Sequence, residues 1–168
     1  MLNADEPTAP TSFDRLLRDE HIGLLRFAYL MCGDHHRAED AVADALARTW
    51  PRWRHGDIDD PKAYVRRAIV NELRGRARRA GVRRRHDDRR VAAPDVRLLD
   101  HDAAERYIVH SALLRLSVQQ RAAVVLRFYE DRSEQQTAEL MGVSPGTVKT
   151  HVHRALEQLR NILEDDEQ

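Results

Sequence analysis

The stretch SEQQTAELMGVSPGTVKTHVHRALEQLR, residues 133–160, has the pattern of two helices joined by a tight turn. Ser133 with Gln136 forms a capping box, which marks the start of the first helix. Gly142 can adopt the positive φ that ends a helix, and Ser144, followed by proline, can cap the next one. A short turn between two helices is typical of the helix-turn-helix motif, so we predict a DNA-binding unit here.

One face of the second helix carries polar and basic side chains close to its start. In helix-turn-helix proteins this half of the helix enters the major groove. Lys149 and Arg154 can reach phosphates or guanine edges, and Thr150 can contact bases or the backbone. The alternative is an ordinary helical hairpin with a solvated basic face. The residues of this face, called the reading face below, are Gly146, Thr147, Lys149, Thr150, His153 and Arg154.

The rest of the chain also predicts helices, and no strand pattern competes with them. Hydrophobic spacing and caps place helices at about 13–32, 36–50, 61–79 and 103–116, with further starts near 118, 134 and 145. Asp60 before Pro61 is the predicted cap of the third helix, and Ser117 with Gln120 fits a capping box before residue 118. Pro51 is expected to end the second helix, and Gly81 is expected to end the third. The segment 82–102 has no clean period. We therefore predict an all-α fold of two small helical domains, 12–81 and 103–164, joined by this flexible linker.

The net charge of zero conceals an uneven distribution of charge along the 168 residues. Residues 1–60 hold 7 basic and 12 acidic side chains, whereas residues 61–90 hold 12 basic and 3 acidic ones. Residues 91–168 are again acidic, with 9 basic and 13 acidic side chains. A basic block inside an acidic chain indicates a polyanionic partner, most simply nucleic acid, although a solvated arginine-rich helix end would have the same composition.

Two helix faces are candidates for binding. The arginine face of the third helix combines Arg67, Asn71, Arg74 and Arg78, which suits phosphate contacts together with one hydrogen-bonding group for a base edge. The acidic face of the second helix carries Glu39, Asp40 and Asp44. Carboxylates would repel DNA, so this face is expected either to be solvated or to meet a basic protein surface.

Several other classes of protein find no support in the sequence. The one cysteine, Cys32, excludes an internal disulfide, and no apolar run reaches the roughly 18 residues that a membrane span needs. Neither Cys32 with His35 and His36, nor His151 with His153, has the spacing of a zinc site. The chain shows no nucleophile–base set and no phosphate-binding glycine loop. We expect a cytoplasmic protein with no metal, no cofactor, no membrane attachment and no enzymatic activity.

Three stretches in this order resemble the extracytoplasmic-function sigma factors, of the actinobacterial SigE-like type. Residues 38–46, AEDAVADAL, look like the signature helix of that family, and residues 64–74, YVRRAIVNELR, look like its promoter-melting and minus-ten segment. Residues 146–150 with Arg154 and Ala155 look like the helix that reads the minus-thirty-five element. The resemblance covers about residues 13–163.

The resemblance implies a role for each matching position. Glu39, Asp40, Asp44 and Arg48 would dock on core RNA polymerase. The arginine face around Asn71 would help to capture a minus-ten base flipped from the melted strand, and the reading face would contact the minus-thirty-five promoter DNA. The linker would thread toward the active-site cleft, and an anti-sigma factor is a further implied partner. The sequence departs from the family pattern in two places. Ala43-Asp44 replaces a commoner Gln-Glu pair, which would weaken one contact with the polymerase clamp. Thr150 and His153 stand where Ser or Arg, and bulkier residues, are frequent, so the promoter sequence does not carry over from a relative.

Two other functions remain open from the sequence. A helix-turn-helix transcriptional regulator would bind duplex operator DNA on its own, usually as a dimer. A helical adaptor or polymerase inhibitor would bind no DNA. Co-purification with core polymerase distinguishes the sigma factor from the regulator, because the regulator needs no polymerase in order to bind DNA.

Overall fold

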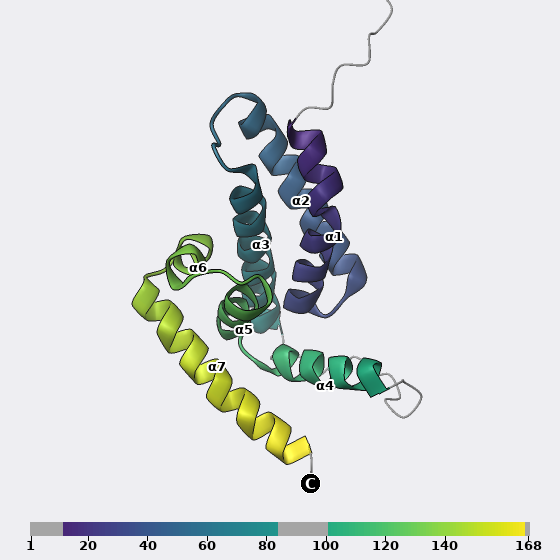
Figure 1. Ribbon diagram of the computed structural model, residues 1–168, viewed down its shortest axis with the longest axis vertical. Helices are drawn as coiled ribbons and strands as arrows, with labels where there is room; N and C mark the ends of the chain where they lie inside the picture. The colour runs from purple at the N-terminus through teal and green to yellow at the C-terminus, as the bar shows by residue number, and fades with distance from the viewer. Residues whose placement is uncertain (1–11, 84–100, 167–168) are drawn as a thin grey trace, which may run out of the picture.

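The computed structural model describes residues 12–83 and 101–166, and these residues form helices with no strand among them (Figure 1). Three long helices come first and four α-helices follow, with one π-helical turn after the fifth. Their bounds are α1 Ser12–Cys32, α2 His35–Arg54, α3 Pro61–Arg83, α4 His101–Arg115, α5 Val118–Val124, η2 Val125–Tyr129, α6 Glu134–Met141 and α7 Pro145–Asp166. The predicted all-α class is confirmed. No helix in the described residues is both long and apolar enough to span a membrane.

Helices α1, α2 and α3 pack lengthwise against one another and enclose the first part of the core (Figure 1). Phe27 on α1, Val42 on α2 and Ile69 on α3 are each at most 1% exposed. Asp60 starts α3 as the sequence predicts, because its carboxylate accepts a hydrogen bond from the Ala63 N–H at 3.0 Å.

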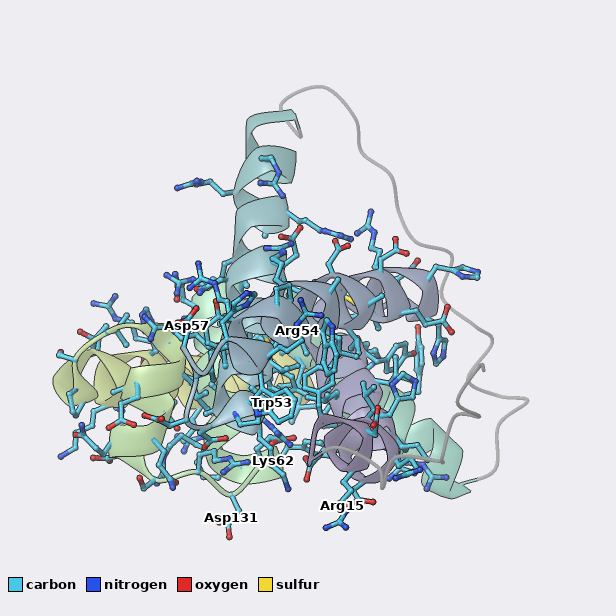
Figure 2. All side chains as sticks on the ribbon, turned by 90° about the horizontal axis from the view of Figure 1, so that it is seen from above. Arg15, Trp53, Arg54, Asp57, Lys62 and Asp131 are labelled. Atoms are coloured by element: carbon cyan, nitrogen blue, oxygen red, sulfur yellow. The ribbon has the colours of Figure 1, made fainter. Side chains whose placement is uncertain are left out.

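Two predicted helix ends are wrong. Helix α2 runs through Pro51 to Arg54, and α3 runs through Gly81 to Arg83. The extra turn of α2 carries Trp53 onto Phe13, with ring centroids 5.6 Å apart. The stabilisation from this packing offsets the loss of the backbone hydrogen bond that proline cannot donate. Figure 2 views this end of the bundle from above, with Trp53 and Arg54 at the end of α2 and Lys62 in the first turn of α3.

The C-terminal helices begin where their capping residues predict. Capping boxes are formed by Ser117 with Gln120 before α5 and by Ser133 with Gln136 before α6. The π-helical turn η2, which follows α5 directly, was not predicted. It leaves Phe128 and Tyr129 more than half exposed, at 61% and 51%.

One apolar cluster runs through both groups of helices, from Phe13 on α1 to Ala155 on α7. Helix α3 packs on α5 and α6 as well as on α1 and α2, so it is the helix of the first group that faces the second group (Figure 1). The predicted linker lies almost wholly in residues 84–100, outside the described residues. The sequence predicted two helical domains but gave no sign that they pack directly against each other.

A buried arginine on α5 joins the ends of two other helices. Arg121 is 7% exposed, and its Nε donates to the Leu113 carbonyl at 2.9 Å. Its Nη2 donates to the carbonyls of Leu114 and Leu116 at 2.9 and 3.1 Å, and its Nη1 donates to the carbonyl of Met31. These carbonyls lie at the ends of α4 and α1, where a cation also meets the negative end of each helix dipole.

We expect Arg121→Met to lower the free energy of unfolding by at least about 3 kcal/mol, because it leaves buried carbonyls without their donor. The measurement is chemical denaturation followed by circular dichroism. Arg160→Met on the exposed surface of α7 is the control and should change the free energy by no more than about 0.5 kcal/mol. Equal effects of the two substitutions would contradict a capping role for Arg121.

Candidate nucleic-acid interface

The helix-turn-helix has the backbone geometry that its sequence predicts. Gly142 ends α6 with φ 65°, in the left-handed region, and the Ser144 hydroxyl accepts from the Thr147 N–H at 3.1 Å at the start of α7. Leu140 on α6 and Val148 on α7 are buried, which fixes the two helices against the core. The motif therefore has a defined turn and a supported second helix.

The reading face of α7 lies on the surface. Five of its members are exposed, namely Gly146, Lys149, Thr150, His153 and Arg154, whereas Thr147 is half-buried next to the cap. Lys149 Nζ lies 3.5 Å from a carboxylate oxygen of Glu134, a surface pair that costs little to break. Burial, with contributions from Arg154 and Arg74, lowers the pKa of the adjacent His151. The face is therefore basic and exposed to solvent.

The arginine face of α3 is only partly open. Arg67, Asn71 and Arg78 are exposed, whereas Arg74 is half-buried. Asn71, Arg74 and Arg78 line a groove of about 550 Å³, which Val118 and Gln119 of α5 complete. The structure therefore brings three of the four predicted residues together, in a groove shared with the second group of helices.

Arg74 is bound by those helices. Its Nη1 donates to the carbonyl of Met141, the last residue of α6, at 2.7 Å. With the amide of Gln119 oriented so that its oxygen faces the guanidinium, that oxygen accepts from Arg74 Nη2 at 2.6 Å and from Nε at 2.9 Å. All three guanidinium nitrogens are thus hydrogen-bonded to residues of α5 and α6.

The acidic face of α2 is exposed, and one end of it joins an ion network with α3. Asp44 lies 3.3 Å from Arg76 and 3.9 Å from Arg48, and Arg48 lies 3.0 Å from Glu72. Hydrogen bonds from Arg76 and Arg48 lower the pKa of Glu72. Glu39 and Asp40 are exposed on the same face, and the charge of Asp40 also acts on Arg76.

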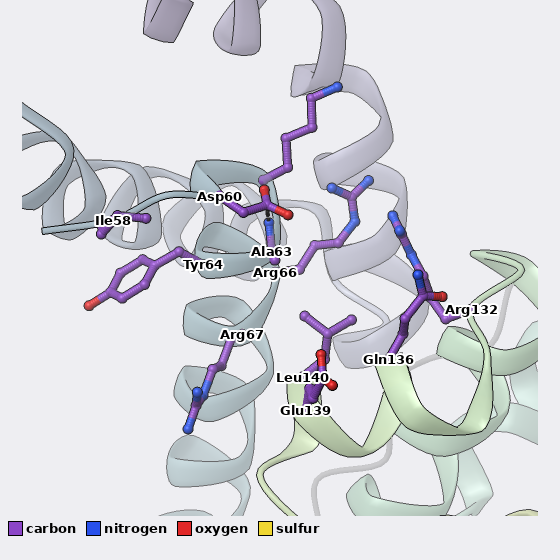
Figure 3. A pocket seen from close by; sticks show the side chains of 11 residues that line it. Ile58, Asp60, Ala63, Tyr64, Arg66, Arg67, Arg132, Gln136, Glu139 and Leu140 are labelled. Carbon is purple, nitrogen blue, oxygen red and sulfur yellow. Dashed lines mark hydrogen bonds between the residues drawn. The ribbon is translucent and has the colours of Figure 1, made fainter. Parts of the chain in front are cut away.

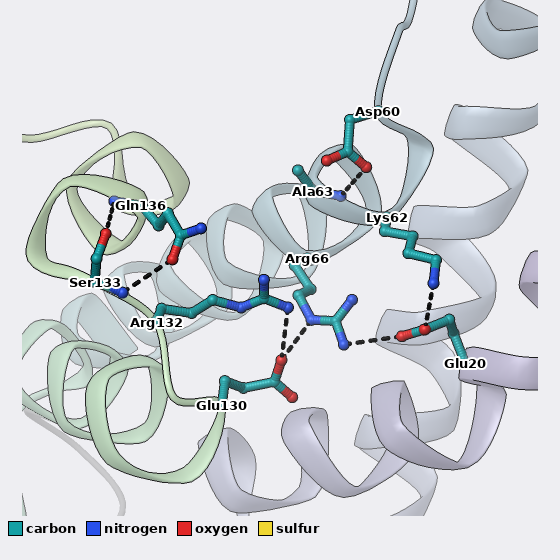
Figure 4. Close-up of polar contacts among 9 residues, drawn as sticks. All are labelled: Glu20, Asp60, Lys62, Ala63, Arg66, Glu130, Arg132, Ser133 and Gln136. Carbon is teal, nitrogen blue, oxygen red and sulfur yellow. Dashed lines mark hydrogen bonds and ion pairs between the residues drawn. The ribbon is translucent and has the colours of Figure 1, made fainter.

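A second ion network, which the sequence did not predict, links the two groups of helices (Figure 4). Arg66 Nε on α3 lies 2.6 Å from a carboxylate oxygen of Glu130, which directly follows η2, and Arg66 Nη2 lies 3.1 Å from Glu20 on α1. The side chains of Arg66 and Glu130 are only 7% and 8% exposed. Lys62, 2.7 Å from Glu20, and Arg132, 3.5 Å from Glu130, extend the network at its two ends.

A cleft of about 500 Å³ opens next to this network, between the start of α3 and α6 (Figure 3). Tyr64, Arg66 and Arg67 line it from α3, and Gln136, Glu139 and Leu140 line it from α6. Arg67 therefore faces the helix-turn-helix across this cleft.

Three aromatic rings, from α1, α2 and α4, stack where α4 packs on α1. Tyr29 on α1 stacks on His35 of α2 at 4.3 Å and on His110 of α4 at 4.6 Å, measured between ring centroids. His110 Nε2 also donates to the Tyr29 carbonyl at 3.4 Å. Burial lowers the pKa of His110, and the nearby charges of Arg121 and His35 lower it further, against the raising effect of the Tyr29 carbonyl.

Sequence reasoning missed Arg66, Arg121, Glu130 and His110. Only Arg121 gave a local signal, since it is a charged side chain directly before the apolar run from Ala122 to Leu126. Within residues 12–83 and 101–166, no group of three or more histidine, cysteine, aspartate or glutamate side chains is placed to hold a metal ion.

Comparisons with known proteins match both groups of helices. The family model for sigma-70 region 2 matches residues 16–83, and that for sigma-70 region 4 matches residues 106–159. The chain is 36% identical over 157 residues to the RNA polymerase sigma-E factor of Streptomyces antibioticus, covering 90% of this chain and 84% of that protein. It is 31% identical over 169 residues to the ECF RNA polymerase sigma factor SigL of Mycobacterium tuberculosis, covering 94% and 92%.

A solved structure has a similar arrangement over almost the whole chain. The sigma factor RpoE of Bartonella quintana, in complex with the anti-sigma factor NepR, matches with a TM-score of 0.72 and 26% sequence identity. The match covers 91% of this chain and 97% of that one.

The histidine stack makes the packing of α4 on α1 sensitive to pH. Because the packed state lowers the pKa of His110, its stabilising contribution is complete above the ordinary histidine value of 6.5 and is lost as the pH falls below it. We expect the melting temperature to fall from about pH 7.5 to about pH 5.5, and His110→Gln to reduce that slope. His36→Gln, at a side chain 96% exposed, is the control, and an unchanged slope in His110→Gln would contradict the assignment.

Proposed function

Because the chain belongs to the extracytoplasmic-function sigma factors of the sigma-70 family, we propose specific roles for its exposed helix faces in promoter recognition. As a member of that family it is an alternative sigma factor, which directs core RNA polymerase to promoters. The observation that carries the residue assignments is the exposed basic start of α7, on a turn held by Gly142 and Ser144. The test is transcription in vitro with purified core polymerase, followed by promoter mapping.

The reading face of α7 contacts the minus-thirty-five element. Lys149 and Arg154 are exposed and can reach guanine edges or phosphates, while Thr150 lies on the same side of the helix. The Thr150 hydroxyl donates to the Gly146 carbonyl at 3.0 Å and keeps an acceptor lone pair for DNA.

The arginine face of α3 holds the melted minus-ten strand. Asn71 is exposed between arginines, so its amide can pair with the edge of an extruded base while Arg67, Arg74 and Arg78 contact phosphates. Capture of the base offsets part of the stacking energy that strand separation costs. Promoter melting of this kind needs no covalent step, and we assign the chain no catalytic activity of its own.

Helix α2 docks on core RNA polymerase through its acidic face, with Glu39, Asp40 and Asp44 meeting a basic surface and Arg48 at the edge. The exposure of these side chains supports the assignment. Arg48 and Asp44 would have to exchange part of their network with α3 for contacts to the polymerase.

The proposed organisation has residues 12–81 as the polymerase- and minus-ten-binding domain, 82–102 as the linker and 103–164 as the minus-thirty-five-binding domain. The protein acts in the cytoplasm, where its polymerase is. An anti-sigma factor is a further proposed partner, supported by the similar sigma factor that was solved together with one. The duplex-binding regulator is set aside, because residues 16–83 match sigma-70 region 2.

We expect Asn71→Ala to reduce open-complex formation about tenfold or more while leaving affinity for core polymerase within about twofold, because one base contact of ~1–3 kcal/mol is lost. Permanganate footprinting measures melting, and a pull-down measures core binding. Asn161→Ala, at an exposed asparagine on α7, is the control. Equal losses of melting and core binding in a folded Asn71→Ala protein would refute the role.

Lys149→Ala or Arg154→Ala should weaken occupancy of the upstream promoter element by holoenzyme, since each removes a contact of ~1–3 kcal/mol if it reads a base. Footprinting of the holoenzyme on a mapped promoter measures this occupancy. The control is Arg160→Ala, at an exposed position about two turns after His153. It should leave the promoter occupancy unchanged. Normal occupancy with either reading-face variant would remove that residue from the interface.

A further inference from the structure

We propose that the cleft between the start of α3 and α6 binds a small molecule that carries a terminal phosphate group (Figure 3). The phosphate accepts hydrogen bonds from Arg66 and Arg132, and the rest of the molecule extends along the cleft toward Arg67. This ligand site goes beyond promoter recognition, and only Arg67 is shared with the binding faces that the sequence predicts.

Two buried N–H groups at one wall of the cleft lack an acceptor. Arg66 Nη1 and Arg132 Nε have no hydrogen-bond partner among residues 12–83 and 101–166. The Arg66 side chain is only 7% exposed, and both arginines line the cleft. A buried donor without an acceptor destabilises a folded protein, so such groups are rare unless something else satisfies them. An oxygen of a ligand in the cleft is the acceptor that these two donors need.

The charges around these donors favour an anion. Arg66 and Arg132 both contact the same carboxylate oxygen of Glu130, at 2.6 and 3.5 Å, and Figure 4 shows the two guanidinium groups side by side. Lys62 and Arg66 likewise share the carboxylate of Glu20, at 2.7 and 3.1 Å. Three cations are therefore balanced by only two carboxylates in this network. The excess positive charge attracts an anionic group to this end of the cleft.

Two further carboxylates line the cleft, and both already have donors. Asp60 caps α3 by accepting from the Ala63 N–H at 3.0 Å, and Glu139 accepts from the Gln135 side chain at 3.1 Å. Arg67, in contrast, is exposed and pairs with no acidic side chain in the part of the chain that the structure describes. The lining groups that still lack a partner are thus cationic.

A terminal phosphate matches this site better than a carboxylate or a phosphodiester does. Near neutral pH it carries a charge of about −1.5 to −2 and offers three acceptor oxygens, whereas the other two groups carry a single charge. Guanidinium groups bind phosphate oxygens through strong, charge-assisted hydrogen bonds. The volume of about 500 Å³ is that of a small-molecule site, and Tyr64 and Leu140 offer apolar surface to the organic part of the ligand.

The test uses the full chain and three phosphate probes, namely inorganic phosphate, glucose 6-phosphate and AMP. Isothermal titration calorimetry measures affinity, and thermal unfolding measures the stabilisation that binding gives. Glucose and adenosine are the matched probes without phosphate. Cyclic AMP keeps the nucleoside but carries a phosphodiester, as a DNA backbone does. Sodium chloride holds the ionic strength constant in every titration.

Two variants remove one donor each from opposite sides of the cleft, Arg132→Gln and Arg67→Gln. Their matched control is Arg160→Gln, at an exposed position on α7. Circular dichroism confirms that each variant is folded.

We expect at least one phosphate probe to bind saturably to the wild type and to raise its melting temperature, whereas glucose and adenosine do neither. Cyclic AMP should bind at least about tenfold more weakly than the tightest phosphate probe. Each cleft variant should weaken the binding of that probe about tenfold or more, because one charge-assisted hydrogen bond is lost, and Arg160→Gln should match wild type.

Three results would overturn the proposal. The first is the absence of saturable binding by all three phosphate probes. The second is wild-type affinity in either folded cleft variant, which would place the bound anion elsewhere on the surface. The third is binding of cyclic AMP as tight as that of the phosphate probes, which would remove the terminal phosphate as the recognised group.

Discussion

A buried ion pair between Arg66 and Glu130 governs how the two groups of helices meet. Its atoms are 2.6 Å apart, and neither side chain is more than 8% exposed. A charge in such a place is costly unless its partner is present, so the pair stabilises the closed arrangement only as a whole. Glu20 and Lys62 on one side and Arg132 on the other spread the charge further. If the two groups separated, Arg66 would keep Glu20 and Glu130 would keep Arg132, but the ion pair between the groups would be lost.

Arginine side chains make the main polar contacts in this chain, because the donors of a guanidinium can bind either protein carbonyls or nucleic-acid phosphates. Arg121 uses this property permanently, for the ends of α1 and α4. Arg74 uses it for α6 in the free protein and, in our account, for DNA in the transcription complex. The same chemistry therefore explains both the packing and the proposed promoter contacts.

The sequence predicted what depends on neighbours along the chain. The caps at Asp60, Ser117, Ser133 and Ser144, and the turn at Gly142, were all placed correctly because each acts within a few residues. Pro51 was misread because the packing of Trp53 on Phe13 overrides its helix-ending tendency, whereas no described contact explains why α3 continues through Gly81. The Arg66–Glu130 pair joins residues 64 positions apart, and the Arg121–Met31 hydrogen bond joins residues 90 positions apart. No local sequence pattern predicts contacts of this kind. The faces of the candidate site were predictable, but the contact of α5 and α6 with the arginine face was not.

The distance between the two groups of helices tests the central claim most directly. Spin labels at Arg18 on α1 and Arg160 on α7, both exposed, with Cys32 replaced by serine, would report it by double electron–electron resonance. The account predicts one narrow, short distribution for the free protein. A broad distribution would contradict it.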